Sequence, residues 1–340
     1  MPSPGPSPGP SIAELSARAV GPDEADATVS AFVRSLLPGI SWSRARALCE
    51  SGRVWVDGAA ARDPASRLAA GSVVEVRGEG ARAPRGPLAP EDVVHVDAEV
   101  VVVRKPAGVL TVPWSEEDRD TLVTLTRALL ARRAPAGAGS PRRGPGPRLR
   151  VVQRLDKETS GLLVFARTIA AERHLQQQLR AHSMARRYLA LVHGAAREAT
   201  YDTLLVPDRG DGLRGSWGVF RKPKGTPPET ARRAATRVAV LERLAGATYV
   251  ACELETGRQH QIRIHLSEAG HPLIGERVYV RGFAGPLLPA PRPMLHAARL
   301  GFTHPRTGRE LVFEAPPPPD FLAVLERLRP GVDLRPGVER

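Results

Sequence analysis

The chain has 340 residues, with 49 Lys and Arg against 36 Asp and Glu, a formal net charge of +13 and 42% hydrophobic residues. This length allows two domains plus tails, and the apolar fraction excludes a chain that is disordered throughout. Only four of the basic residues are lysine. Such a positive charge favours a polyanion as partner, because each phosphate that the protein neutralises releases counterions.

Two cysteines, Cys49 and Cys252, are too few and too far apart for a disulfide framework or a CxxC metal site. They favour a reducing compartment. No apolar run of about 18 residues occurs, and the N-terminal MPSPGPSPGPS lacks the apolar segment of a signal peptide. We therefore expect a soluble, cytoplasmic protein.

The first part of the chain predicts a small α+β module at residues 26–80, after a disordered Pro-rich tail at residues 1–25. Apolar residues from Thr28 onward have helical spacing, and a second helix begins with Ser41 or Ser43 as its cap. Two short strands follow, RVWVDG and GSVVEVRG.

Residues 81–90 form a Pro/Gly linker, after which a second domain is predicted over residues 91–330. It begins with two strands and a helix. Residues 131–148 are low-complexity and basic. They are either a solvated insertion or an arginine-rich arm that touches a nucleic-acid backbone, because composition does not separate the two.

The most informative stretch is QRLDKETSGLLVFA, residues 153–166. A strand through residues 148–152 would deliver Arg154 and Asp156 onto a short turn before a second apolar strand. A carboxylate between buried strands is unfavourable unless it is paired. Spacing alone favours a structural Asp156 that caps the turn over a functional one.

RLDKETSGLLVFA resembles the catalytic motif R-L-D-x-x-T-S-G of the RluA-type RNA pseudouridine synthases, in which the Asp is essential. Four further segments resemble the same family in order, between residues 100 and 321: VVVVRKPAGVLTVP, RRYLALVHG, ETGRQHQIRIHLSEAGHPLIGERVY, and MLHAARLGFTHP with FEAPPPPDF. The N-terminal GISWSRARALCESGRVWVDG resembles an S4 domain, a small RNA-binding fold.

The resemblance implies isomerisation of uridine, in which the N1–C1′ bond breaks, the uracil turns and C5 bonds to C1′ without redox change, so that no cofactor is needed. It makes Asp156 the catalytic carboxylate, Arg263 its ion-pair partner, and Tyr188 the residue that stacks on the base and helps to remove the C5 proton. One carboxylate can suffice, since the departing uracil spreads its charge over two carbonyls. Whether Asp156 attacks the sugar, attacks the base or removes a 2′ proton stays open.

A uridine inside folded RNA has to be extruded to reach Asp156. Arg154 is placed to contact a phosphate or fill the vacated stack, and Arg258 to make a phosphate or structural contact. A surface ion pair is the competing interpretation for Arg154. In the N-terminal module, the predicted donors to phosphates are Ser43, Arg44, Arg46 and Arg53.

Two positions depart from the family's usual pattern: Gln153 replaces a common histidine, and Glu276 replaces a common aspartate. Both keep hydrogen-bonding capacity, and neither is expected to touch the catalytic set. His260 and His265 suggest a metal site, but histidines five residues apart on a helix do not face one another, and no H-E-x-x-H occurs. We expect no zinc site.

The sequence thus predicts an α+β protein: an S4-like module, a linker, and a catalytic domain with a mixed, largely antiparallel sheet, flanking helices and a basic cleft around Asp156. The expected function is pseudouridine synthesis in structured RNA, in ribosomal RNA rather than transfer RNA, by a monomer without an obligate protein partner. The alternatives are a non-catalytic RNA-binding or RNA-folding protein on the same fold and, less well supported, a hydrolase that releases uracil.

Overall fold

The computed structural model describes residues 16–50, 52–76, 88–113, 118, 120–133, 148–220 and 225–329. The chain divides into two compact units, Met1–Arg85 and Gly86–Arg340. The division falls within the predicted linker 81–90, of which residues 81–87 lie outside the described residues. So do most of the basic stretch 131–148 and residues 221–224. None of the described helices has the length and apolar character of a membrane span.

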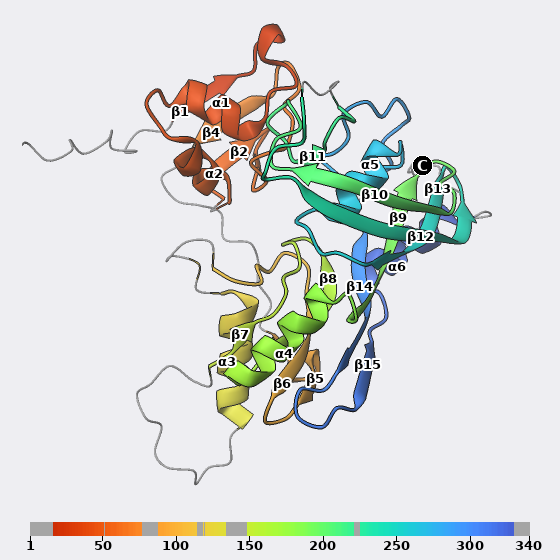
Figure 1. The fold of residues 1–340 in the computed structure, drawn as a ribbon. Coiled ribbons are helices and arrows are strands. Elements are labelled where there is room, and N and C mark those ends of the chain that lie inside the picture. The colour runs from red at the N-terminus through yellow and green to blue at the C-terminus, as the bar shows by residue number, and fades with distance from the viewer. Residues whose placement is uncertain are drawn as a thin grey trace, which may run out of the picture. The chain divides into compact units, whose positions relative to one another are not determined.

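The first unit, red to orange in Figure 1, is a four-stranded antiparallel sheet in the order β1-β4-β2-β3 with two helices. Its elements are β1 (Ser16–Ala19), η1 (Pro22–Glu24), α1 (Val29–Leu36), α2 (Trp42–Glu50), β2 (Val54–Val56), β3 (Ala59–Ala60) and β4 (Val73–Val76). Thr28 caps α1 by accepting a hydrogen bond from the Ala31 N–H at 3.2 Å. The Ser41 hydroxyl accepts from the Arg44 N–H at 3.2 Å, so Ser41, not Ser43, caps α2.

Strand β1 corrects one sequence expectation. Folded structure was expected to start at residue 26, but Ser16–Ala19 pairs with Val73–Val76 along the sheet edge. The sequence SARA carries no β-branched or aromatic residue, so it has little strand propensity of its own. Its conformation depends on a partner far along the chain, which a local pattern does not reveal.

The second unit is built on an eleven-stranded sheet in the order β11-β10-β12-β13-β9-β14-β8-β6-β5, with β15 paired to β14 and β7 to β8. Its strands are β5 (Val93–Val96), β6 (Val100–Lys105), β7 (Arg150–Val151), β8 (Ser160–Ala166), β9 (Ala185–His193), β10 (Ala199–Val206), β11 (Gly215–Ser216), β12 (Arg232–Leu244), β13 (Ala247–Leu254), β14 (Leu295–Thr303) and β15 (Glu310–Glu314). Only β14 and β8 pair in parallel among the described strands, which confirms the expected mixed, largely antiparallel sheet.

Helices cover both faces of this sheet (Figure 1). They are η2 (Pro90–Asp92), α3 (Leu122–Arg133), α4 (Ile169–Arg180), α5 (Gln261–Glu268) and α6 (Pro319–Leu328). The period of two along β6 separates two cores: Val101 and Val103 belong to the core that includes α3 and α5, whereas Val100 and Val102 belong to the core that includes α4. A third core lies under α6. The α+β fold class is confirmed.

Candidate active site

Asp156 lies on a turn between β7 and β8. The Thr159 N–H donates to the Asp156 carbonyl at 3.1 Å and closes the turn. On its other side, the buried Thr111 hydroxyl donates to the Leu155 carbonyl at 2.8 Å and accepts from the Leu155 N–H at 3.2 Å. The residue next to Asp156 is therefore fixed in both its backbone groups.

The Lys105 side chain holds the backbone of the Asp156 turn. Its ammonium is fully buried and donates to the carbonyls of Pro106 at 2.9 Å, Val109 at 2.8 Å and Lys157 at 2.8 Å. Three N–H donors thus have three acceptors. Burial lowers the pKa of Lys105 to about 7, against the opposing attraction of Glu158 and Asp156. Lys105 joins the end of β6 to the residue that follows Asp156.

The parallel strand β14 and Arg292, which precedes it, support the turn at the end where β8 begins. Gly161 has a φ of 116°, and a Cβ there would lie 2.2 Å from the Ala297 carbonyl oxygen, so only glycine allows this approach. Arg292 donates to the Glu158 carbonyl at 3.0 Å and forms an ion pair with Asp320 at 2.7 Å. Ser160 is hydrogen bonded to Nδ1 of His296 at 2.9 Å.

The Asp156 carboxylate stands partly open to solvent, with 27% of its side chain exposed. Its Oδ2 lies 3.8 Å from the Arg263 guanidinium, and its Oδ1 lies 4.0 Å from Nε2 of His260. The structure therefore brings together Asp156 and Arg263, the two residues that the resemblance pairs. Their proximity supports the assignment of Arg263 as the partner, while its role in the reaction stays a prediction.

Glu276 corrects a second expectation, that its difference from the family pattern lies outside the catalytic set. Its carboxylate accepts two hydrogen bonds from Arg263, at 2.7 and 2.8 Å, and another from the Val278 N–H at 3.0 Å. Burial by itself raises the pKa of Glu276, but Arg263 and the backbone donors outweigh it and hold this pKa at about 2. The pair fixes the guanidinium that faces Asp156. A signal was present: Arg263 lies between two isoleucines, and Glu276 follows the apolar pair Leu273 and Ile274.

Tyr188 lies on β9, paired with Cys252 of β13 and Ala297 of β14, and is 8% exposed. Burial raises its pKa to about 12, and the Asp156 carboxylate adds to the rise. The phenol therefore keeps its proton at neutral pH. A protonated phenol is a poor proton acceptor, but its ring can still contact the uracil of the substrate.

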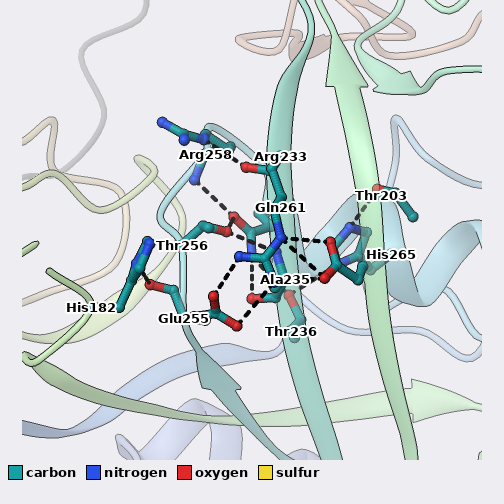
Figure 2. Close-up of polar contacts among 11 residues, drawn as sticks. His182, Thr203, Arg233, Ala235, Thr236, Glu255, Thr256, Arg258, Gln261 and His265 are labelled. Carbon is teal, nitrogen blue, oxygen red and sulfur yellow. Dashed lines mark hydrogen bonds and ion pairs between the residues drawn. The ribbon is translucent and has the colours of Figure 1, made fainter. Parts of the chain in front are cut away.

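The segment between β13 and α5 is held by the side chain of Gln261 (Figure 2). Its Oε1 accepts from the Thr256 hydroxyl at 2.7 Å and from the Arg258 N–H at 2.9 Å. Its Nε2 donates to the Ala235 carbonyl and the Thr236 hydroxyl on β12, both at 2.9 Å. Two distant segments are thus joined at one buried amide.

Two residues near Gln261, His265 and Arg258, also make hydrogen bonds within the protein. His265 is buried and is hydrogen bonded to Thr236 and Thr203 (Figure 2). The exposed Arg258 donates to the Arg233 carbonyl at 3.0 Å. Among the residues that the structure describes, no three His, Cys, Asp or Glu side chains gather as a metal ion would require.

Most of the other predicted RNA contacts are exposed side chains. Arg154 is exposed on the turn, and Ser43, Arg44 and Arg46 are exposed in the first two turns of α2, with Arg53 half-buried before β2. On a helix, Ser43 and Arg46 share a side, whereas Arg44 and Arg46 do not. The roles of these residues stay predictions.

One pocket of the second unit has a volume of about 620 Å³. Four arginines and two glutamates are among its lining residues: Arg186, Arg187, Arg237, Arg299, Glu253 and Glu255. Asp156 is not one of them. The basic cleft expected around Asp156 therefore stays a prediction.

Comparison with known families agrees with this architecture. Residues 99–268 match the RNA pseudouridylate synthase family, a range that contains Asp156, Tyr188 and Arg263. Residues 30–74 match the S4 domain.

Curated relatives match over most of the chain. A ribosomal large subunit pseudouridine synthase D of Pseudomonas aeruginosa is 36% identical, over 86% of this chain and 89% of the relative. The protein of the same name from Nitrosomonas europaea is 34% identical, over 86% of this chain and 82% of the relative.

Among solved structures, human RNA pseudouridylate synthase domain containing 4 has a TM-score of 0.54 at 21% identity, covering 70% of this chain and 93% of the human chain. At this identity the likeness concerns the fold alone. The family match and the curated relatives carry the conclusion further: this chain belongs to the RNA pseudouridylate synthase family and is an RNA pseudouridine synthase with an S4 domain.

Proposed function

We propose that the enzyme isomerises uridines in the RNA of the large ribosomal subunit, with Asp156 as its catalytic carboxylate. The observation that carries the assignment of Asp156 is its position: a partly exposed carboxylate, 3.8 Å from a buried arginine, on a turn held from three sides. The names of the curated relatives support the RNA class. We further propose that the enzyme acts in the cytoplasm as a monomer.

The chemistry needs a carboxylate that stays ionised and is held in one orientation. Arg263 supplies a fixed positive charge beside Asp156 because Glu276 holds its guanidinium through two hydrogen bonds. The target uridine is extruded from the RNA and meets Asp156. Tyr188 contacts the uracil as a protonated phenol, because its pKa of about 12 opposes ionisation.

RNA is held by two groups of donors in this proposal. Arg154 and Arg258 contact the backbone near the extruded nucleotide. The S4 domain contacts phosphates through Ser43, Arg44, Arg46 and Arg53. Arg53 is half-buried and the other five residues are exposed. This exposure supports their role in contacting the RNA backbone.

The test is a pseudouridine-specific chemical map of total RNA from cells that carry the wild-type gene, no gene, or Asp156→Asn. We expect one or a few sites in large-subunit ribosomal RNA to lose pseudouridine without the gene and to stay unmodified with Asp156→Asn. The matched control is Glu158→Gln, an isosteric change of another carboxylate on the same turn, which should restore the sites.

The outcomes separate the parts of the proposal. Modification restored by Asp156→Asn would contradict the role of Asp156. Sites lost only from transfer RNA would contradict the RNA class. No change at any site, with RNA still bound by the purified protein, would favour an RNA-binding protein without turnover.

A further inference from the structure

His260 approaches the Asp156 carboxylate oxygen that Arg263 does not face. Nε2 of the imidazole lies 4.0 Å from Oδ1 of the carboxylate, while Arg263 lies 3.8 Å from Oδ2. Charge-assisted hydrogen bonds are shorter, about 2.7–2.9 Å. Each carboxylate oxygen therefore has a nitrogen group near it at more than hydrogen-bond distance, and its lone pairs stay available to a substrate.

The backbone at His260 adopts a conformation that most residues avoid. His260 is the residue before α5 and has a φ of 58°, in the left-handed region. The Gln261 amide holds the preceding turn through Thr256 and the Arg258 N–H. This turn keeps the imidazole at the start of α5, beside Asp156.

The other ring nitrogen of His260 is fixed by Tyr279. Nδ1 lies 2.8 Å from the Tyr279 hydroxyl, and the two rings meet edge to face with centroids 5.6 Å apart. Tyr279 is 2% exposed, and burial raises its pKa, so it keeps a proton to donate. When Nδ1 accepts this proton, the imidazole carries its own on Nε2, the atom that faces Asp156.

Tyr279 also supports the second donor. The Arg263 guanidinium lies over its ring at 5.2 Å from the centroid. One buried aromatic residue thus contacts both groups that flank the carboxylate. A change at Tyr279 should therefore act on Asp156 through them.

We propose that His260 is a positioning residue for Asp156: its Nε2–H, oriented by the Tyr279 hydroxyl, tightens to a hydrogen bond on Oδ1 in the RNA complex, while Arg263 does the same on Oδ2. This rests on the proposed role of Asp156. The two donors fix the direction in which the carboxylate presents its lone pairs.

The experiment compares two substitutions of His260 in the full-length enzyme. His260→Gln keeps an N–H donor near the position of Nε2. His260→Asn suits the left-handed backbone and reaches Tyr279 but not Asp156. We expect His260→Asn to lower the single-turnover rate constant at saturating RNA by about tenfold to a hundredfold, the range for removal of a hydrogen bond to a charged group. His260→Gln should recover most of the rate, and RNA affinity should not change in either.

Two further variants complete the design. Tyr279→Phe should slow the wild-type enzyme but have no added effect in His260→Asn, because both changes act through one contact. The control is His182→Asn, at an exposed histidine that also has a positive φ, of 55°. It should turn over at the wild-type rate.

The results decide between the two proposals. A wild-type rate for His260→Asn, no recovery in His260→Gln, or additive effects with Tyr279→Phe would overturn the role of His260. If those results came with an inactive Asp156→Asn, the proposed function would stand without this inference. An active Asp156→Asn would instead remove the basis of both.

Discussion

Arginines serve differently in the two units of this enzyme. In the catalytic unit, three of them are buried and paired: Arg263 with Glu276, Arg209 with Asp211 and Arg292 with Asp320. In the S4 domain, Arg44 and Arg46 stand exposed in the first two turns of a short helix. The net charge of +13 counts both kinds of arginine equally. Only the structure separates arginines that hold the protein together from those open to an RNA phosphate.

The largest expected effect is at the buried pair of Arg263 and Glu276. Glu276→Gln should lower the free energy of unfolding by about 3–5 kcal/mol, because it leaves a buried guanidinium with only the partly exposed Asp156 carboxylate, 3.8 Å away, as counter-charge. Replacing both partners, as in Arg263→Met with Glu276→Met, should restore much of the stability but not the activity. Urea unfolding and single-turnover kinetics measure the two quantities. A stable, active double variant would show that the pair is structural only.

The same pair predicts a pH dependence. The pKa of Glu276 is lowered from an ordinary value of 4.5 to about 2 in the folded protein. A lowered carboxyl pKa contributes stability that is fully present above the unfolded value and is lost as the pH falls through the folded value. The difference in unfolding free energy between the wild type and Glu276→Gln should therefore shrink between pH 4.5 and about 2. A difference that stays constant across this range would argue against the pairing.

Arg292→Met should have a smaller effect, about 2 kcal/mol of unfolding free energy, for the removal of charged hydrogen bonds. Its partner Asp320 is 38% exposed, so water can solvate the carboxylate that remains. The substitution also removes the bond to the Glu158 carbonyl on the Asp156 turn. We expect single-turnover rates to fall together with stability in urea titrations. An unchanged rate would mean that β14 and Lys105 suffice to hold the turn.

The smallest effect on stability is expected in the S4 domain. Arg44→Ala and Arg46→Ala should leave the unfolding free energy within about 0.5 kcal/mol. Each should weaken RNA binding and reduce the slope of log affinity against log salt by about 1, because one phosphate is no longer neutralised. Arg18→Ala, which removes a surface ion pair with Glu24, is the control. Unchanged slopes would refute the proposed S4 contacts.

Much of this arrangement could be predicted from the sequence. The apolar runs of β6 and β8, the helical spacing after Thr28 and the glycine at Gly161 are local signals, and these elements form where their patterns place them. Asp156 and Arg263 could be paired only through the resemblance to a family. Their separation of more than a hundred residues gives no local signal.

The residues that sequence analysis missed act through partners distant in the chain or through backbone groups. Glu276 is significant because of the guanidinium it holds, and Lys105 because of three carbonyls that no sequence pattern displays. The left-handed conformation of His260 depends on contacts made by Gln261. Such roles appear only when the chain is folded.

The dependence of the Asp156 turn on β14 has a consequence for the order of events during synthesis. The turn takes its final form only when Arg292 reaches the Glu158 carbonyl and His296 pairs with Ser160, contacts that span 134 and 136 residues. The S4 domain has no such requirement, because its strands pair within the first unit. A nascent chain emerging from the ribosome can therefore complete its RNA-binding domain well before it can modify a uridine.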